Sequence, residues 1–481
     1  MNPQGSGDSA TFWVVVEKAA QQLFWLLLFI VMAPILGPRA YGQFALVMVF
    51  IGFCELILVD AATEALVSLV TISRAHLGTA LLANVVAAAV IALVAWLAAA
   101  PISVVFDDPD LAALVRALAP LPLVAALTAG PIALLRRALA FRPLALRSII
   151  GLAAGGAVGV ALALRGYGVS ALVAQALVQR TVELIVLWIA QTGAIALAWS
   201  PACWRDMRDF ARNVMVGRAM NWMSGQAPRL IIGYMLGPVA LGLLTLAGRA
   251  ADALIQVTVQ PRATVARIEL MADRGHGAQF EARIRAMARD AAVVAFPAMI
   301  GAAAVTPQLF ALWLDARWQD GVLPTQLMLL SGVPLLGFYF CTAGLMAANR
   351  SDLDARIAVW QSTTNALVTA LAAPFGLNAT VAAMLLRLFA LLPLASVRLA
   401  GAAGIRAGAI VGGTLPILGA AVAMGLAIHA TDRFVALPGP GALQLALLVA
   451  EGVVLYAGAL LLIDRAAVRH LISRARTLTP D

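Results

Sequence analysis

Charged residues are scarce in this 481-residue chain, at 12% of the sequence, whereas hydrophobic residues make up 62%. Soluble domains carry about 25% charged residues, so a chain this poor in charge cannot cover itself with a polar surface. In lipid, only helices or closed barrels satisfy the backbone. The apolar runs have the length of spanning helices, roughly 20 residues, whereas barrel strands have about 10. The composition therefore predicts an all-α polytopic membrane protein.

Cysteine and histidine are also rare, which excludes several kinds of site. The three cysteines are scattered and the four histidines are isolated, so we expect no disulfide framework and no metal site. The start MNPQGSGDSATFW lacks a basic n-region and a small-residue cleavage site, so we expect no signal peptide. The net charge of +9 is spread over short loops, which favours a topological role over binding of nucleic acid.

Apolar runs broken by Gly, Pro and charge predict fourteen transmembrane helices. They are placed at 12–36, 41–71, 78–106, 112–135, 146–164, 169–195, 214–236, 240–262, 290–314, 323–347, 354–375, 378–399, 407–430 and 442–464. The arginine-rich segment 263–289 has apolar residues at helical spacing and predicts a helix lying at the inner headgroup surface. No segment has room for a soluble catalytic domain, which argues against an enzyme.

The distribution of positive charge orients these helices. With the N-terminus inside, 23 of the 33 Lys and Arg residues lie in inside segments and five in outside segments. The outside segments also hold the acidic run FDDPD, which starts at Phe106. This asymmetry follows the positive-inside rule and predicts that both termini are cytoplasmic. The other five basic residues fall within helices: Arg180, Arg218, Arg229, Arg249 and Arg387.

A turn sequence occurs twice, two hundred residues apart. ILGPRAYGQFAL begins at Ile35 and MLGPVALGLLTL at Met235, and their Leu-Gly-Pro and later Gly positions coincide without a gap. An even number of predicted helices separates the copies, so both turns face the same side of the membrane. This predicts two six-helix lobes related by an axis along the membrane normal.

The helix before each turn carries a basic and amide stripe on one face. The first stripe holds Lys18, Gln21, Gln22 and Trp25, and the second holds Arg218, Asn221, Trp222, Gln226 and Arg229. Polar side chains facing lipid would be costly, so we expect both stripes to face a water-filled cavity between the lobes.

Several stretches in order resemble one known family. They are LGPRAYGQFALV from Leu36, LLRRALAFRPLALRSIIG from Leu134, GYGVSALVAQALVQ from Gly166, LDARWQDGVLPTQLMLLS from Leu314 and AANRSDLDARI from Ala347. Together they resemble the Wzx-type lipid-linked oligosaccharide flippases, in the polysaccharide transporter branch of the multidrug/oligosaccharidyl-lipid/polysaccharide (MOP) exporter superfamily. The resemblance covers most of residues 12–400, and residues 401–481 match only as two extra helices.

The resemblance implies two six-helix lobes around a central cavity, with two additional C-terminal helices. It implies movement of an undecaprenyl-pyrophosphate-linked oligosaccharide from the inner to the outer leaflet of a bacterial inner membrane. Membrane lipids, a polysaccharide polymerase and glycosyltransferases are then the expected partners. We expect an N-lobe at 1–195, a cytoplasmic linker at 196–213, a C-lobe at 214–400, and helices 13 and 14 with a cytoplasmic tail at 401–481.

A pyrophosphate headgroup needs cations, and Arg holds phosphate through a planar fork of donors. The candidates for this contact are Lys18, Arg218, Arg229, Arg249 and Arg387. Lys18 and Arg218 lie near the predicted cytoplasmic end, where snorkelling is the alternative. Sugars need amides and aromatic faces, for which the candidates are Gln22, Trp25, Asn221, Trp222 and Gln226.

Acids within the predicted helices are candidates for coupling to H⁺ or Na⁺: Glu55, Asp60, Glu64 and Asp252. Arg180 can pair with Glu183, and Arg249 with Asp252, at i,i+3. Such pairing predicts that Glu55 is the deepest unpaired acid. A static salt bridge from Arg229 to Glu55, Asp60 or Glu64 is the alternative to a phosphate role for that arginine.

Two other functional classes fit the hydropathy. A multidrug or metabolite antiporter of the same superfamily would share both lobes. A polytopic glycan polymerase or ligase usually needs a large outside loop with catalytic Arg or His, and the outside loops predicted here are all short. Glycosyltransferase genes beside this one would favour a flippase over an antiporter.

Overall fold

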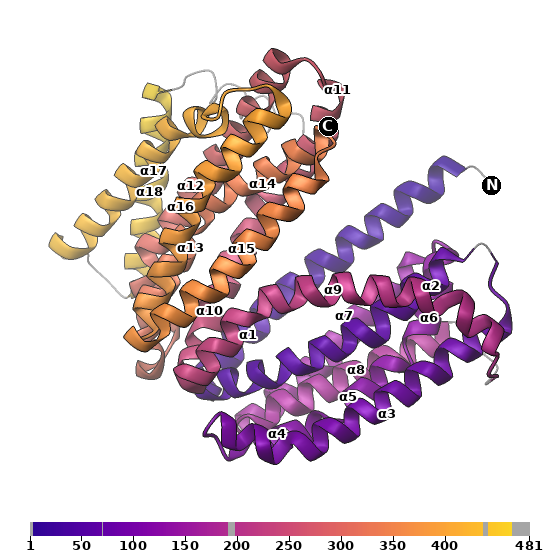
Figure 1. Ribbon diagram of the computed structural model, residues 1–481. Coiled ribbons are helices and arrows are strands. Elements are labelled where there is room, and N and C mark those ends of the chain that lie inside the picture. The colour runs from indigo at the N-terminus through magenta and orange to yellow at the C-terminus, as the bar shows by residue number, and fades with distance from the viewer. Residues whose placement is uncertain (1–2, 70, 191–197, 436–440, 464–481) are drawn as a thin grey trace. The chain divides into compact units, whose positions relative to one another are not determined.

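The computed structural model describes residues 3–69, 71–190, 198–435 and 441–463 (Figure 1). The predicted helix ends at 191–195 and 464, and most of the predicted cytoplasmic tail, lie outside these residues. Within them every regular element is a helix, which confirms the all-α fold class. The chain divides into two compact units, Met1–Gly242 and Leu243–Asp481. The lobe and linker boundaries given above stay predictions.

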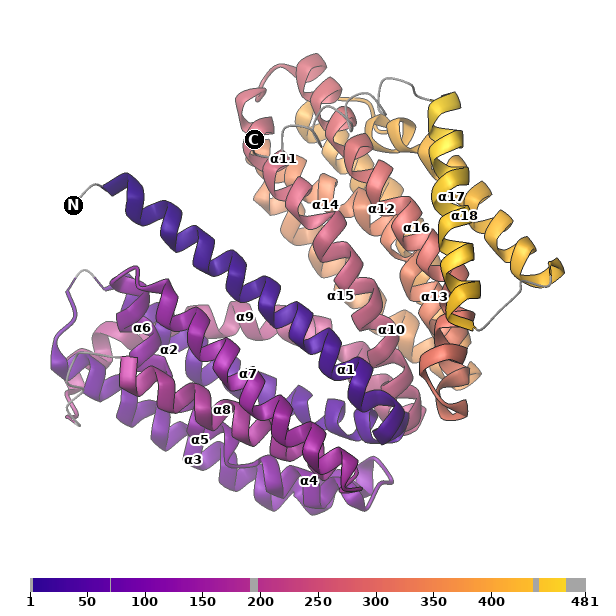
Figure 2. The same cartoon turned by 180° about the vertical axis from the view of Figure 1, so that it is seen from behind.

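Unit 1 holds α1 and α9, the helices that carry the two predicted polar stripes. Its elements are α1 (Pro3–Glu55), the π-helix η1 (Leu56–Asp60), α2 (Ala61–Ser68), α3 (Arg74–Val105), α4 (Asp110–Leu118), α5 (Leu121–Ala126), α6 (Ala129–Arg137), α7 (Phe141–Leu164), α8 (Ser170–Ala190), α9 (Pro201–Met235) and the start of α10 (Gly237–Thr258). A short loop joins α7 to α8, and the two helices lie side by side in both views (Figures 1 and 2).

Unit 2 is built around a long central helix. Its elements are the rest of α10, α11 (Gln260–Ala272), α12 (Gly277–Trp313), the 3₁₀ turn η2 (Ala316–Gly321), α13 (Val322–Leu330), α14 (Gly332–Ala347), α15 (Ser351–Ala372), the 3₁₀ turn η3 (Ala373–Phe375), α16 (Leu377–Ala403), α17 (Ala409–Phe434) and α18 (Gly441–Ile463). Helix α12 packs on α13, α14, α17 and α18. Phe280, Phe296 and Met299 on α12 and Phe340 on α14 are buried in the core of this unit.

Exposed apolar side chains show where lipid takes the place of protein. On α3, Val90, Leu93 and Leu97 are each more than half exposed. Soluble proteins rarely expose an apolar surface of this extent to water. Eleven helical segments of the described residues are long and apolar enough to cross a membrane by length and composition. The protein is therefore a multi-pass membrane protein.

Three of the fourteen predicted crossings are absent from these eleven for identifiable reasons. Segment Ala20–Glu55 covers parts of both predicted helices 12–36 and 41–71 but is a single apolar segment, because the helix continues across a kink at Gly37. Helices α9 and α15, which contain the predicted spans 214–236 and 354–375, are not among the eleven apolar segments. The count of fourteen stays a prediction.

Both copies of the repeated turn place glycine in a conformation that other residues rarely adopt. Gly37 has φ of 75° and Gly237 has φ of 82°, and a Cβ is strained at such angles. At the first turn α1 is kinked at Gly37, and at the second α9 ends at Met235 and α10 begins at Gly237, with a proline of fixed φ directly after each glycine. The repeat seen in the sequence is thus a repeat of backbone geometry.

Two predicted helices are wrong in detail. The predicted helix 41–71 is interrupted by η1, a π-helical turn at Leu56–Asp60, before α2 ends at Ser68. The segment 263–289 is not one helix at the headgroup surface: α11 ends at Ala272, and α12 begins at Gly277 and continues into the membrane-spanning part. Phe280 and Ile284 are buried, so this amphipathic pattern reflects packing within unit 2.

Candidate functional site

A stripe of glycines on α7 allows α8 to approach very closely. A Cβ at Gly151 would crowd Glu183, and one at Gly155 or Gly159 would crowd Gln179 or Gln175. Both sets of residues repeat every four positions and so form facing stripes, the small-residue packing typical of membrane helices. As a result three polar side chains of α8 are buried against backbone: Gln175, Gln179 and Glu183.

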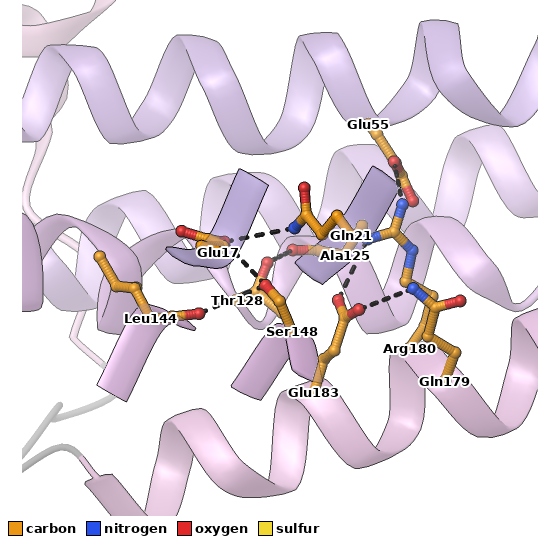
Figure 3. Close-up of polar contacts among 10 residues, drawn as sticks. All are labelled: Glu17, Gln21, Glu55, Ala125, Thr128, Leu144, Ser148, Gln179, Arg180 and Glu183. Carbon is orange, nitrogen blue, oxygen red and sulfur yellow. Dashed lines mark hydrogen bonds and ion pairs between the residues drawn. The ribbon is translucent and has the colours of Figure 1, made fainter. Parts of the chain in front are cut away.

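Arg180 on α8 is shared by two carboxylates from different helices (Figure 3). Its Nη2 donates to Oε2 of Glu55 at 2.8 Å, and its Nη1 donates to Oε2 of Glu183 at 3.1 Å. Gln179 also donates to Oε1 of Glu183, at 2.9 Å. The Glu183 side chain is 7% exposed and that of Glu55 is 23% exposed. Arg180 therefore joins the end of α1 to α8 within the membrane-spanning part of unit 1.

A second polar group lies beside this one, on α1 and α7. Ser148 on α7 donates to Oε1 of Glu17 at 2.8 Å, and Gln21 donates to the same oxygen at 3.3 Å (Figure 3). Arg147 precedes Ser148, and its charge interacts with those of Glu17 and Glu183. Within the described residues the Arg147 side chain forms no hydrogen bond or ion pair, and its Nε is buried without a partner. Such a guanidinium has its full set of donors available for an anion.

A cavity of about 380 Å³ inside unit 1 is lined by the Arg180 cluster (Arg180, Glu55 and Glu183) and by Arg147. Its polar lining comes from Glu55, Thr128, Arg147, Arg180 and Glu183, and its aromatic lining from Trp222. The size is that of a small-molecule site. The π-helical turn η1 begins directly after Glu55, and such turns are frequent at functional sites.

The structure brings together two predicted residues of different roles. Glu55, predicted to couple a cation, and Trp222, predicted to contact sugar, line the same cavity. Trp222 lies 5.4 Å from the ring of Phe53 and packs over Gly52. The prediction that Glu55 is unpaired is wrong, because Arg180 reaches it from another helix. The predicted i,i+3 pair of Arg180 with Glu183 is confirmed.

The remaining predicted residues of unit 1 have other partners or lie at the surface. Arg229 donates to Oε1 of Gln226 at 3.0 Å, and Glu64 pairs with Arg136 at 3.7 Å. Lys18 and Gln22 on α1 are exposed and Trp25 is half-buried. The side chains of three further candidates lie outside the described part of the structure: Asp60, Arg218 and Asn221.

Unit 2 holds the other three predicted residues. Arg249 is half-buried and Asp252 exposed on α10. Arg387 on α16 donates to the carbonyl oxygen of Gln361 at 2.8 Å and to Oγ1 of Thr364 at 3.4 Å. One donor of Arg387 is thus hydrogen-bonded to a backbone carbonyl. The Nε of Arg387 is buried and has no partner in the described residues.

The sequence analysis missed five residues of this site: Glu17, Arg147, Ser148, Gln175 and Gln179. Arg147 was expected at the inside end of the predicted helix 146–164, but α7 begins at Phe141, so Arg147 lies one turn deeper in the helix. A signal was available, because Gly151, Gly155 and Gly159 have the same spacing as Gln175, Gln179 and Glu183. Among the described residues, no three His, Cys, Asp or Glu side chains are grouped so that they could hold a metal ion.

Comparison with known proteins identifies related sequences. Residues 31–323 match the family model for polysaccharide biosynthesis proteins. The succinoglycan biosynthesis transport protein ExoT of Rhizobium meliloti (strain 1021) is 26% identical over 247 residues, which is 51% of this chain. The chain spans about half the length of that curated relative.

Solved structures show the same fold at low sequence identity. The lipid II flippase MurJ in an inward closed conformation has a TM-score of 0.74 at 12% identity, over 95% of this chain and 100% of that one. An inward-facing multidrug resistance MATE family transporter of the MOP superfamily has a TM-score of 0.59 at 12% identity, over 81% and 98%. These matches confirm the predicted exporter fold. The matched proteins are transporters and flippases by name, in agreement with the prediction of a protein that is not an enzyme.

Proposed function

Because the chain belongs to the polysaccharide biosynthesis protein family, we propose that it moves a lipid-linked oligosaccharide across a bacterial inner membrane. The substrate would be a polysaccharide repeat unit on undecaprenyl pyrophosphate, moved from the inner to the outer leaflet by alternating access. Glycosyltransferases would supply this substrate inside and a polymerase would consume it outside. Both termini would be cytoplasmic.

The observation that carries this proposal is the cavity of unit 1, which holds an arginine with free donors among membrane-spanning helices. Ionisable side chains inside a membrane protein are costly and mark transport pathways. Arg147 offers a planar fork of donors that fits a phosphate oxygen pair. Trp222 in the same cavity offers an aromatic face to a sugar.

The basic residues predicted from the sequence remain part of the proposed path. Lys18 and Arg218 would attract the headgroup, and Arg229, Arg249 and Arg387 would bind it further along. Gln22, Trp25, Asn221, Trp222 and Gln226 would contact the glycan. We add Arg147 to this set, because its side chain lines a cavity and has no ion pair with a described acid.

Cation coupling would act through the guanidinium of Arg180. A proton on Glu55 would abolish that carboxylate's attraction to Arg180 and leave Arg180 held by Glu183 alone. The end of α1 would then be released from α8, which gives a two-state element that a proton can bias. Glu64, Asp60 and Asp252 remain proposed secondary positions for H⁺ or Na⁺.

The function is tested in cells that lack their own flippase for the same repeat unit. We expect the chain to restore surface polysaccharide, Arg147→Ala to abolish this, and Arg147→Lys to restore it poorly because the fork is lost. Arg165→Gln is the matched control, since Arg165 follows the same helix and is exposed, and its side chain has no hydrogen bond or ion pair within the described residues. Surface polysaccharide at wild-type level with Arg147→Ala would remove Arg147 from the path.

A multidrug or metabolite antiporter of the same superfamily is the alternative, and the MATE fold likeness is what favours it. The two functions give opposite results with one pair of assays. An antiporter would expel a cationic dye from cells and would leave surface polysaccharide absent. We expect restored polysaccharide and no dye efflux.

A further inference from the structure

A second pocket lies in unit 2, separate from the cavity described above. It has a volume of about 350 Å³ and is lined by α14, α15 and α16. Phe338, Leu391 and Leu394 form part of its apolar wall, and Arg356 and Arg398 are its cationic residues. No acid occurs among its described lining residues.

The two arginines come from different helices and lie toward the same end of the α15–α16 pair. Arg356 lies in the second turn of α15, and Arg398 lies near the end of α16, and these helices are joined by the tight turn η3 at their other ends. On α16, Leu391, Leu394 and Arg398 are spaced at i, i+3 and i+7 and so share one face. The pocket is therefore a slot with an apolar body and a basic end.

Neither arginine is neutralised by the protein. Both side chains belong to exposed residues, and within the described residues neither forms a hydrogen bond or an ion pair. Of the two acids at the start of α15, Asp352 pairs with Arg350 at 2.9 Å, and Asp354 is not among the residues that line the pocket. Arg387, on the same face of α16, is bound to the carbonyl oxygen of Gln361. Two unpaired guanidiniums beside an apolar slot complement an anionic headgroup on an apolar chain.

We propose that this slot binds an anionic phospholipid, with its phosphate between Arg356 and Arg398 and an acyl chain against Phe338, Leu391 and Leu394. Trp360, which is 61% exposed at the rim, has the amphipathic ring that favours the level of lipid headgroups. Basic pockets between membrane helices bind lipid headgroups in this way. By the predicted topology, the basic end faces the cytoplasmic leaflet, where anionic lipids are available.

The experiment uses the full chain in nanodiscs of phosphatidylcholine with a minor share of phosphatidylglycerol, followed by native mass spectrometry. We expect wild type to retain phosphatidylglycerol and the double variant Arg356→Gln/Arg398→Gln to lose it. Each arginine near a membrane surface contributes roughly fivefold to affinity, so the loss should be about 25-fold. The control is Arg262→Gln/Arg267→Gln on α11, which removes the same charge from two residues without described partners.

Further arms separate the lipid from other occupants. Leu394→Trp fills the slot and keeps both arginines, so it should also lose phosphatidylglycerol while the protein stays folded. Equal retention by wild type and the Arg356/Arg398 variant would overturn the proposal, and so would retention of phosphatidylcholine in preference to phosphatidylglycerol. Binding of inorganic phosphate in detergent, lost with the arginines but unchanged by Leu394→Trp, together with no lipid retention, would identify a soluble anion and also overturn it.

Discussion

Gly42 lies directly against the backbone carbonyl of Pro238, and Gly242 lies in the same way against the carbonyl of Pro38. All four residues belong to unit 1. The two copies of the repeated turn therefore pack on each other through equivalent positions, so each copy supplies both the glycine and the carbonyl. This reciprocal packing explains why the glycine after each Leu-Gly-Pro turn recurs at the same spacing.

The first prediction concerns this contact. A Cβ at Gly42 or at Gly242 would overlap a carbonyl oxygen, and backbone cannot move aside as a flexible side chain can. We expect Gly42→Ala and Gly242→Ala each to lower the free energy of unfolding by at least about 1–3 kcal/mol, measured as a fall in Tm in detergent.

Gly419→Ala on α17 is the control for that measurement. Gly419 is in a helix and a Cβ there meets open space, so Ala should be favoured by up to about 1 kcal/mol. An unchanged Tm for both Gly42→Ala and Gly242→Ala would show that the two turns do not pack as described.

The second prediction is topological. Helix α12 is a single helix from Gly277 to Trp313, so residues that flank it must lie on opposite sides of the membrane. We expect a cysteine at His276, in the exposed turn before α12, to react with an impermeant maleimide only from the cytoplasmic side. A cysteine at Gln319, in η2 after α12, should react only from outside.

The native cysteines set the background for this labelling. Cys203 and Cys341 are buried and Cys54 is half-buried, so the unmodified protein should react little. Labelling of both introduced cysteines from the same side would contradict the single crossing by α12.

The local features of the site could be read from the sequence, whereas the contacts between helices could not. The pair Arg180 and Glu183 is visible at i,i+3, and the geometry of Gly37 and Gly237 follows from the repeat. The contact of Arg180 with Glu55 joins residues 125 positions apart, and its prediction requires knowing how α1 and α8 both pack on α7. The glycine stripe on α7 indicates only the close approach of α8 to α7.

The error at 263–289 has a different cause. Arginines and apolar residues alternate there with helical period, as in a helix lying on a membrane. The same pattern arises when a helix packs one face on a protein core, and Phe280 and Ile284 show that it does so here. The periodicity of apolar residues shows that one face of a helix is apolar, but it does not show whether lipid or protein covers that face.

The third prediction concerns Asp108 in the loop after α3. Its side chain is 2% exposed and accepts hydrogen bonds from Gln43 at 2.8 Å, from Arg39 at 3.4 Å and from the backbone of Asp110 at 3.2 Å. Hydrogen bonds to a charged group contribute about 1.5–3 kcal/mol each. We expect Asp108→Ala to lower the free energy of unfolding by at least about 2 kcal/mol.

Asp107→Asn is the matched control for Asp108. Asp107 is its neighbour and is exposed, with φ of 48° that Asn also tolerates. A Tm for Asp108→Ala equal to that of Asp107→Asn would mean that the acidic run acts only as an outside loop charge.

The last prediction concerns how much each of the two ion pairs of Arg180, with Glu183 and with Glu55, contributes to stability. Removing the guanidinium leaves two carboxylates without it inside the membrane-spanning part, and breaking a buried pair costs about 3–5 kcal/mol. Glu183 is 7% exposed and Glu55 is 23% exposed, so the cost of an uncompensated charge should be greater at Glu183. We expect Arg180→Gln to lower the Tm strongly.

Arg180→Gln/Glu183→Gln should recover more stability than Arg180→Gln/Glu55→Gln, because Gln179 can still hydrogen-bond an amide at position 183. Thermal unfolding of the three variants in detergent measures this recovery. Equal recovery by both double variants would mean that burial does not set the free-energy cost of the uncompensated carboxylate.

A transport assay then distinguishes a structural role of Arg180 from a role in coupling. Arg180→Gln/Glu183→Gln should be stable and yet export little glycan, since the guanidinium that responds to a proton on Glu55 is gone. Normal export by that stable variant would exclude Arg180 from coupling.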